Sequence, residues 1–105
     1  MLNEIKQWST ETFPNQATTS VTHHLNEELI ELYQVCDGVD RGEDVGERSV
    51  AEEIADCIIL LVALAGIYGI DIEEAIKNKH EINRTRTFKY DEKRGYHKRV
   101  REVIK

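Results

Sequence analysis

The chain has 105 residues, of which 40% are hydrophobic and 32% are charged, with one proline and six glycines. This composition is typical of one small globular domain and excludes a disordered chain or a fibrous repeat. The formal charge of −6 is unevenly distributed, because residues 1–83 contain 17 acidic and 5 basic residues, whereas residues 84–105 contain 9 basic and 3 acidic ones. An acidic body with a basic C-terminal segment suggests a nucleic-acid-binding tail, a flap over a charged substrate, or pairing of the tail with the chain's own acids.

The N-terminal half predicts two helices. Residues 2–12 form a short amphipathic segment, which the proline that follows brings to an end. A second helix is expected from Thr19 or Ser20 to Asp37, because its apolar residues are spaced by three and four positions. Gly38 is expected to cap this helix at its C-terminus.

The third helix is expected to start at a capping box, Ser49 to Glu52, and to end near Tyr68. From Cys57 onward it is apolar nearly all round, and a helix without a polar face must be buried on every side. Three other short helices can hardly cover it in a monomer. We therefore expect an all-α fold completed by a second copy, as a homodimer or homotetramer.

A fourth helix is expected after the cap at Asp71, running to about Arg86, and a short last helix could form at Val100 and residues 103–104. The longest apolar run is shorter than the roughly 18 residues that a membrane span needs, and the N-terminus does not resemble a signal peptide. We expect a cytoplasmic protein with no membrane partner. The two cysteines fall on apolar helix stripes and are expected to be reduced core residues.

Four acidic residues fall on stripes that should face the core. At 100° per residue, Glu28 lies in the middle of the apolar stripe of the second helix and Glu31 lies at its edge, while Glu53 lies on the stripe of the third helix with Asp56 beside it. Four carboxylates brought together would become protonated unless a cation neutralised them. Oxygen ligands favour Mg²⁺, or Mn²⁺, over zinc. A favourable interaction with the helix dipole is the alternative reason for an acid in the first turn of a helix, but among these four residues it would account only for Glu53. The residues therefore predict a divalent metal site.

The segment Glu27-Glu28-Leu-Ile-Glu31, followed by Glu53-Ile-Ala-Asp56, resembles the EExxE…ExxD signature of the MazG-type all-α nucleotide pyrophosphohydrolases. The resemblance runs from about Trp8 to Arg86. It implies a MazG-like domain at residues 1–87, a basic extension at residues 88–105, and a four-helix bundle shared by two or four subunits.

The resemblance also implies an activity, the Mg²⁺-dependent hydrolysis of ribo- or deoxynucleoside triphosphates to monophosphates and pyrophosphate, as in nucleotide-pool control. In this activity the catalytic and metal-binding residues would be Glu28, Glu31, Glu53 and Asp56. A neighbouring carboxylate would accept the proton of the attacking water, and Glu27 and Glu28 are the two candidates.

Further residues are candidates for binding the substrate. The family places phosphate-binding groups at the positions of Lys79, Asn83 and Arg86, although basic residues at a helix C-terminus also interact with its dipole. Trp8 could stack on the base or anchor the core. His24 could contact the nucleotide or a ligating carboxylate, or form a structural hydrogen bond.

Two other functions place different demands on the sequence. A di-iron bundle needs Glu-x-x-His pairs, and neither acid pair includes a histidine. A helical module could bind nucleic acid or a protein partner through its basic tail, but the acidic body would oppose nucleic-acid binding. The residues of that tail are Arg84, Arg86, Lys89, Lys93, Arg94, Lys98 and Arg99, with Tyr90 and Tyr96 between them.

Overall fold

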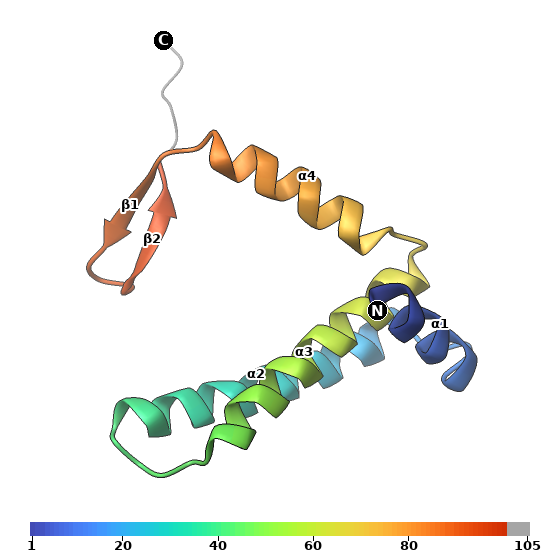
Figure 1. Cartoon of the computed structure of the whole chain (residues 1–105), viewed down its shortest axis with the longest axis horizontal. Helices are drawn as coiled ribbons and strands as arrows, with labels where there is room; N and C mark the ends of the chain where they lie inside the picture. Colours follow the sequence, from blue (N-terminus) through green and yellow to red (C-terminus); the bar gives the residue numbers. More distant parts are fainter. Residues whose placement is uncertain (101–105) are drawn as a thin grey trace. The chain divides into compact units, whose positions relative to one another are not determined.

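The computed structural model describes residues 1–100, except for the side chains of residues 47 and 48. It contains four helices followed by one antiparallel hairpin (Figure 1). The elements are α1 (Leu2–Thr12), α2 (Thr18–Asp40), α3 (Glu47–Ile67), α4 (Ile72–Arg84), β1 (Phe88–Asp91) and β2 (Tyr96–Arg99). The predicted four helices are confirmed.

The chain divides into two compact units, Met1–Ile72 and Glu73–Lys105, and each is described by itself. The domain boundary expected near residue 87 stays a prediction. No single helix among residues 1–100 is long and apolar enough to cross a membrane, and α3 and α4 meet that requirement only when taken together.

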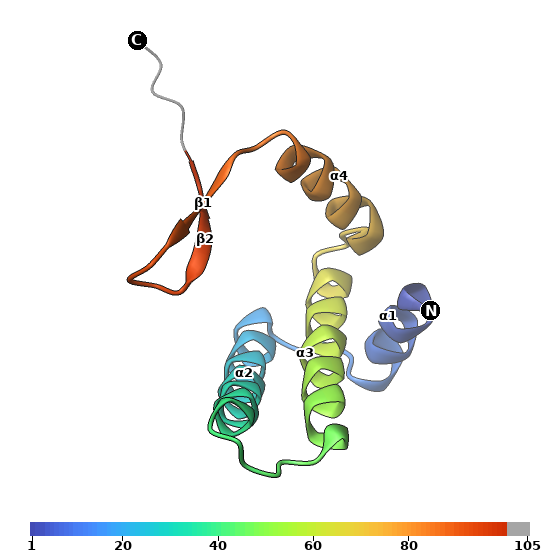
Figure 2. The ribbon, with the colours of Figure 1, turned by 60° about the vertical axis from the view of Figure 1, so that its left-hand side comes forward.

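In the first unit, α3 is the central helix. α2 lies alongside it in both ribbon views, and α1 packs against its C-terminal half (Figure 2). The core is small: it contains Val21 from α2 together with Cys57, Val62, Ala63 and Ala65 from α3. The small side chains on α3 let α1 approach closely, because a Cβ added at Gly66 would lie 3.1 Å from Lys6 Cγ.

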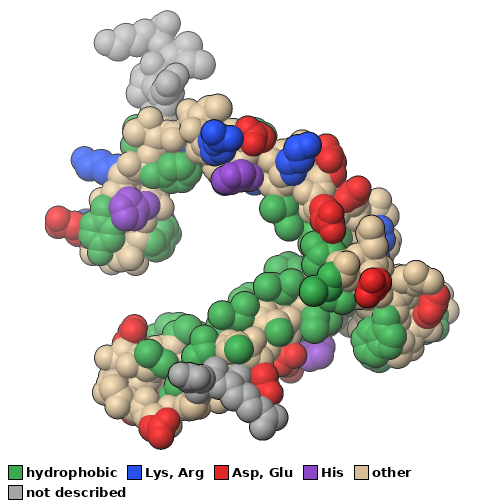
Figure 3. Space-filling view, in the orientation of Figure 1, with side chains coloured by type: hydrophobic (Ala, Val, Ile, Leu, Met, Phe, Trp, Pro, Cys, Tyr) green, Lys and Arg blue, Asp and Glu red, His purple; other side chains and the backbone are tan. Residues whose placement is uncertain are grey.

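Much of the apolar surface of α2 and α3 remains exposed in the single chain. Figure 3 shows hydrophobic side chains gathered along these two helices. The large exposed apolar residues are Leu29, Ile30, Tyr33 and Val39 on α2, and Ile54, Ile58, Ile59, Leu61 and Ile67 on α3. One chain therefore does not bury the apolar helix α3. The predicted oligomer depends on this exposure, but the oligomer itself stays a prediction.

The predicted C-terminus of α2 and the predicted N-terminus of α3 are wrong, whereas α3 ends at Ile67, next to the expected Tyr68. α2 continues through the buried Gly38 to Asp40, because this glycine makes room for the following loop rather than capping the helix. A Cβ at Gly38 would lie 2.8 Å from Val45 Cγ1. α3 begins at Glu47, two residues before the expected capping box, after Gly46 with a φ of 78°.

The hairpin was not predicted. The carboxylate of Asp91 accepts hydrogen bonds from the backbone N–H groups of Lys93 and Arg94, at 3.0 and 3.1 Å, and Gly95 completes the turn with a φ of 74°. The short last helix is wrong at Val100, whose N–H donates to Thr87 O at 2.7 Å. Positions 103–104 lie outside the described residues. The basic tail therefore begins as a β-ribbon.

The two cysteines differ in their surroundings. Cys57 is buried on α3, as expected, whereas Cys36 is exposed on α2. The expectation that both lie in the core is wrong for Cys36. Helical spacing alone indicated an apolar stripe, but the stripe on α2 is wider than the surface that α3 covers.

Candidate metal centre

The carboxylates that helical phasing predicts as metal ligands lie between α2 and α3. Glu28 comes from the middle of α2, and Glu53 and Asp56 come from one face of α3, a single turn apart. Each of the three side chains offers an oxygen, and these oxygens all lie within 4.8 Å of one another. We call Glu28, Glu53 and Asp56 the carboxylate cluster.

Partial burial of Glu28 and Glu53 distinguishes this cluster from an ordinary acidic surface, whereas Asp56 is exposed. The Glu28 side chain is only 17% exposed. Glu28 Oε2 and Glu53 Oε2 are buried, and neither has a hydrogen-bond partner among the described residues. A buried carboxylate oxygen without a partner is costly, and a hard divalent cation takes oxygen ligands of this kind. The residues present therefore fit a divalent metal ion.

The negative charges of the site oppose one another. Repulsion from Glu28 is the largest cause that raises the pKa of Glu31, followed by desolvation. Desolvation is the largest cause that raises the pKa of Glu53, followed by repulsion from Glu31 and Glu28. Glu31, the fourth predicted ligand, thus interacts with the carboxylate cluster without belonging to its tightest group. Its role as a ligand stays a prediction.

A thiol also adjoins the site. Burial, and then the negative charges of Glu28, Glu53 and Asp56, raise the pKa of the Cys57 thiol. The neutral thiol is a poor ligand for a hard cation, because the thiolate is the form that binds metals. The donor set that faces a cation is therefore made of carboxylate oxygens.

Two histidines pair with the glutamates one turn along α2. His23 Nε2 lies 2.9 Å from Glu27 Oε1, and the Glu27 side chain is 60% exposed. His24 Nε2 lies 3.3 Å from Glu28 Oε1. Glu27 thus lies outside the carboxylate cluster, and its catalytic role stays a prediction. The spacing of four residues between His24 and Glu28 is the sequence signal for their contact.

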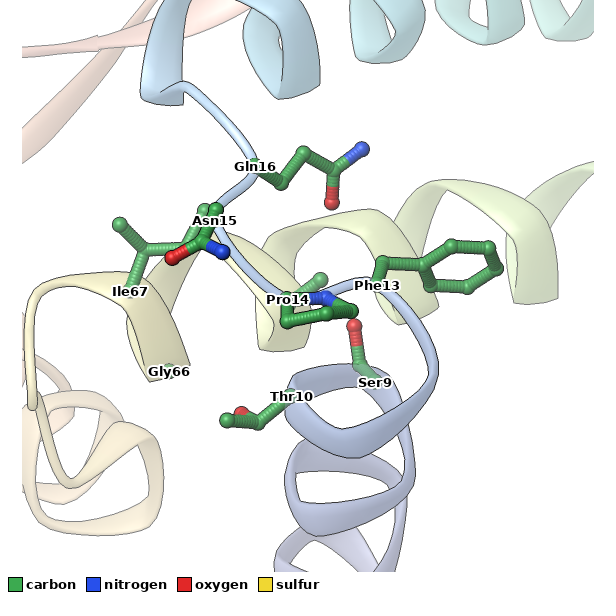
Figure 4. Close-up of a pocket in the computed structure, with 9 residues that line it drawn as sticks. Ser9, Thr10, Phe13, Pro14, Asn15, Gln16, Gly66 and Ile67 are labelled. Carbon is green, nitrogen blue, oxygen red and sulfur yellow. The ribbon is translucent and has the colours of Figure 1, made fainter.

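The predicted base-binding residue Trp8 lies on α1 and is 55% exposed, so it does not anchor the core. Its ring meets that of Phe13 edge to face, with centroids 5.6 Å apart. Phe13 lines a pocket of about 240 Å³ between the segment that follows α1 and the end of α3 (Figure 4). The other lining residues are Ser9, Thr10, Pro14, Asn15, Gln16, Ala63, Gly66 and Ile67. Apart from Phe13, which the sequence suggested could line a base pocket beside Trp8, these lining residues were not predicted, because they share no spacing along the chain.

The predicted phosphate-binding residues belong to the second unit. Lys79 and Asn83 lie one turn apart on α4, and Arg86 Nη1 donates a hydrogen bond to Asn83 Oδ1 at 3.3 Å. The structure therefore brings Asn83 and Arg86 together. Their part in binding phosphate, and that of Lys79, stays a prediction.

Comparison with known proteins adds three findings. A family model described as dATP/dGTP pyrophosphohydrolase matches residues 1–104. The dATP/dGTP diphosphohydrolase of Salmonella phage PMBT28 is 34% identical over 84 residues, which are 80% of this chain. The match covers about a quarter (25%) of that curated relative's own length.

The third finding is a solved structure that resembles this fold. It is the cyanophage S-2L MazG-like pyrophosphohydrolase bound to dGDP and three catalytic Mn²⁺ ions per active site. The two structures superpose with a TM-score of 0.69 at 28% sequence identity. The match covers 95% of this chain and 93% of the cyanophage chain.

Proposed function

Because the chain belongs to the dATP/dGTP pyrophosphohydrolase family, we propose that it hydrolyses a purine deoxynucleoside triphosphate to the monophosphate and pyrophosphate. The observation that carries this proposal is the carboxylate cluster, with its two buried oxygens that have no partner among the described residues. Such oxygens are suited to hold a cation against a polyphosphate. The phage relative and the cyanophage structure support the same reaction class.

Glu28, Glu53 and Asp56 would hold the divalent cation. When bound, the cation supplies positive charge opposite the negative charge that develops on the phosphate oxygens. Mg²⁺ is proposed as the cofactor, and Mn²⁺ as an ion that replaces it, because both accept carboxylate oxygens. The Mn²⁺ ions in the cyanophage structure support a divalent cation of this class.

The pocket beside Phe13 is the proposed site of the nucleoside. Asp56, Ala63 and Ile67 recur at spacings of seven and four, so they lie on one face of α3. Ala63 and Ile67 line the pocket, and Asp56 belongs to the carboxylate cluster. Seven helical residues span roughly 10 Å, a distance that a nucleotide can bridge. The carboxamide of Asn15 offers both donors and acceptors to a purine edge.

The second proposal about this enzyme is that it works as a homodimer or homotetramer. The exposed apolar residues of α2 and α3 support it, because a large exposed apolar surface typically marks an interface. Light scattering coupled to size-exclusion chromatography measures the molar mass and tests this directly. A monomer at micromolar concentration would contradict it.

The reaction is tested by incubating the full chain with each ribo- and deoxynucleoside triphosphate and Mg²⁺, or Mn²⁺ in parallel. Phosphorus NMR then identifies the products. The proposal requires dATP and dGTP to yield monophosphate and pyrophosphate. Release of inorganic phosphate with a diphosphate would contradict cleavage at the α-phosphorus. Tight binding of single-stranded DNA, with steep salt dependence and no hydrolysis, would instead favour a nucleic-acid-binding module acting through the basic hairpin.

A further inference from the structure

Two histidine–glutamate pairs lie side by side on α2 and have the same spacing of four residues. They differ in the burial of the carboxylate. In the first pair both side chains are mostly exposed, at 76% for His23 and 60% for Glu27. In the second pair His24 is 54% exposed, whereas Glu28 is only 17% exposed. The chain thus contains one pair at the surface and a second pair that reaches into the carboxylate cluster.

The two oxygens of Glu28 have different surroundings. Oε1 lies 3.3 Å from His24 Nε2, whereas Oε2 is buried with no hydrogen-bond partner among the described residues. A carboxylate is planar, so a contact that holds one oxygen also sets the direction of the other. Carboxylates that bind metals are commonly held in this way by a neighbouring donor, and loss of that donor weakens metal binding about 10- to 100-fold.

We propose that His24 is a positioning residue that holds Glu28 Oε1 so that Oε2 is directed at the divalent cation. The inference rests on the metal site of the proposed function. Of the alternatives for His24, it selects contact with a ligating carboxylate over contact with the nucleotide. The two roles have different consequences: a positioning residue changes the affinity for the metal in the absence of nucleotide, whereas a nucleotide contact changes the KM of the substrate at saturating metal.

The test measures Mn²⁺ binding to the full-length chain without nucleotide, by the electron paramagnetic resonance signal of free Mn²⁺. His24→Ala removes the contact, and His24→Gln keeps an N–H donor at similar reach. His23→Ala is the matched control, because it removes the equivalent contact one residue away. Thermal unfolding in EDTA checks that the variants remain folded, which is expected because His24 is half exposed and leaves no cavity.

His24→Ala is expected to weaken Mn²⁺ binding about 10-fold or more, His24→Gln to recover part of the loss, and His23→Ala to stay within about 2-fold of the wild type. Equal losses in His24→Ala and His23→Ala would overturn the proposal. So would unchanged Mn²⁺ binding in His24→Ala combined with a raised KM. If His24→Ala weakens Mn²⁺ binding in a chain that releases no pyrophosphate, the positioning role is supported and the proposed function alone is overturned.

Discussion

Glu28 on α2 and Glu53 on α3 each have one carboxylate oxygen that is buried without a hydrogen-bond partner among the described residues. The two side chains come from different helices, so the packing of α2 against α3 brings their carboxylates together. Burial of unpaired negative charge destabilises the metal-free fold, and a bound cation removes that cost. The stability of the chain should therefore depend on metal.

Metal binding should stabilise the folded chain. At a concentration 100 times its Kd, a cation that binds only the folded state adds about 2.7 kcal/mol, which raises the Tm by on the order of 10 °C for a domain of this size. Calorimetry with Mg²⁺ or Mn²⁺, and then with excess EDTA, measures the shift. Glu53→Gln should lose most of it. An equal shift in that variant would argue against Glu53 as a ligand.

The metal-free chain should lose stability as the pH rises. Repulsion from Glu28 raises the pKa of Glu31 above its ordinary value of 4.5, so the folded state binds this proton more tightly than the unfolded state does. The stabilising contribution of Glu31 is therefore complete below about pH 4.5 and is lost as the pH rises through the folded pKa. In EDTA, Glu31→Gln should unfold at a higher temperature than the wild type at pH 8 but at the same temperature at pH 4. A constant difference across this range would contradict the electrostatic cause.

Removal of one cluster carboxylate should abolish most of the activity. Asp56 is exposed, so Asp56→Asn should fold normally while losing a ligand. Metal ions contribute several kcal/mol to the stabilisation of a transition state, and each 1.36 kcal/mol is a factor of ten in rate, so kcat/KM should fall by at least about 100-fold. Glu52→Gln, a carboxylate on the same helix outside the cluster, is the control and should stay within about 3-fold of the wild type.

Nucleotide binding should change the fluorescence of Trp8. Trp8 is the only tryptophan, and its ring contacts Phe13, which lines the proposed nucleoside pocket. Stacking of a base on an aromatic ring contributes about 1–3 kcal/mol, so Phe13→Leu should raise the KM for dATP about 10-fold with little change in kcat. A fluorescence titration with nucleotide measures the first effect, and initial rates at varied dATP with Mg²⁺ measure the second. An unchanged KM in Phe13→Leu would place the base elsewhere.

The two packed helical glycines should respond differently to alanine. Alanine stabilises a helix by about 1 kcal/mol relative to glycine. At Gly38 the new methyl group would lie 2.8 Å from Val45 Cγ1, and overpacking of this kind costs about 1–3 kcal/mol, so Gly38→Ala should lower the Tm. At Gly66 the nearest atom is Lys6 Cγ, in a flexible side chain at 3.1 Å, so Gly66→Ala should be neutral or stabilising. Thermal unfolding of both variants in one buffer checks the order.

The carboxylate cluster could be predicted from the sequence because a residue's position along a helix determines the face on which its side chain lies. This requires no knowledge of residues distant in the chain. Glu28 lies on an apolar stripe, and a charged residue on such a stripe indicates either a partner or a ligand. The pairing of Glu28 with the α3 acids needed the packing of two helices. Phasing alone could not show that Glu31 would be set apart from the tightest group of oxygens.

Other features depend on contacts that spacing does not show. Gly38 has the local signature of a helix cap, but the loop side chain Val45 packs against it and α2 continues past it. The hairpin was missed because each of its strands has only four residues and is almost fully exposed, so any alternation is too short to indicate a half-buried strand. Asp91 followed by Gly95 was the available turn signal.

Cys36 is exposed and Cys57 is buried, so the rates at which their thiols are labelled can report how often α2 and α3 separate. A thiol reagent added to the native protein should label Cys36 at once, whereas Cys57 should react only when α2 and α3 come apart. The ratio of the two labelling rates then reports how often the helix pair opens. An ion held across Glu28 and Glu53 should slow labelling of Cys57 and leave that of Cys36 unchanged, so alkylation followed by mass spectrometry would measure how firmly the ion joins the two helices.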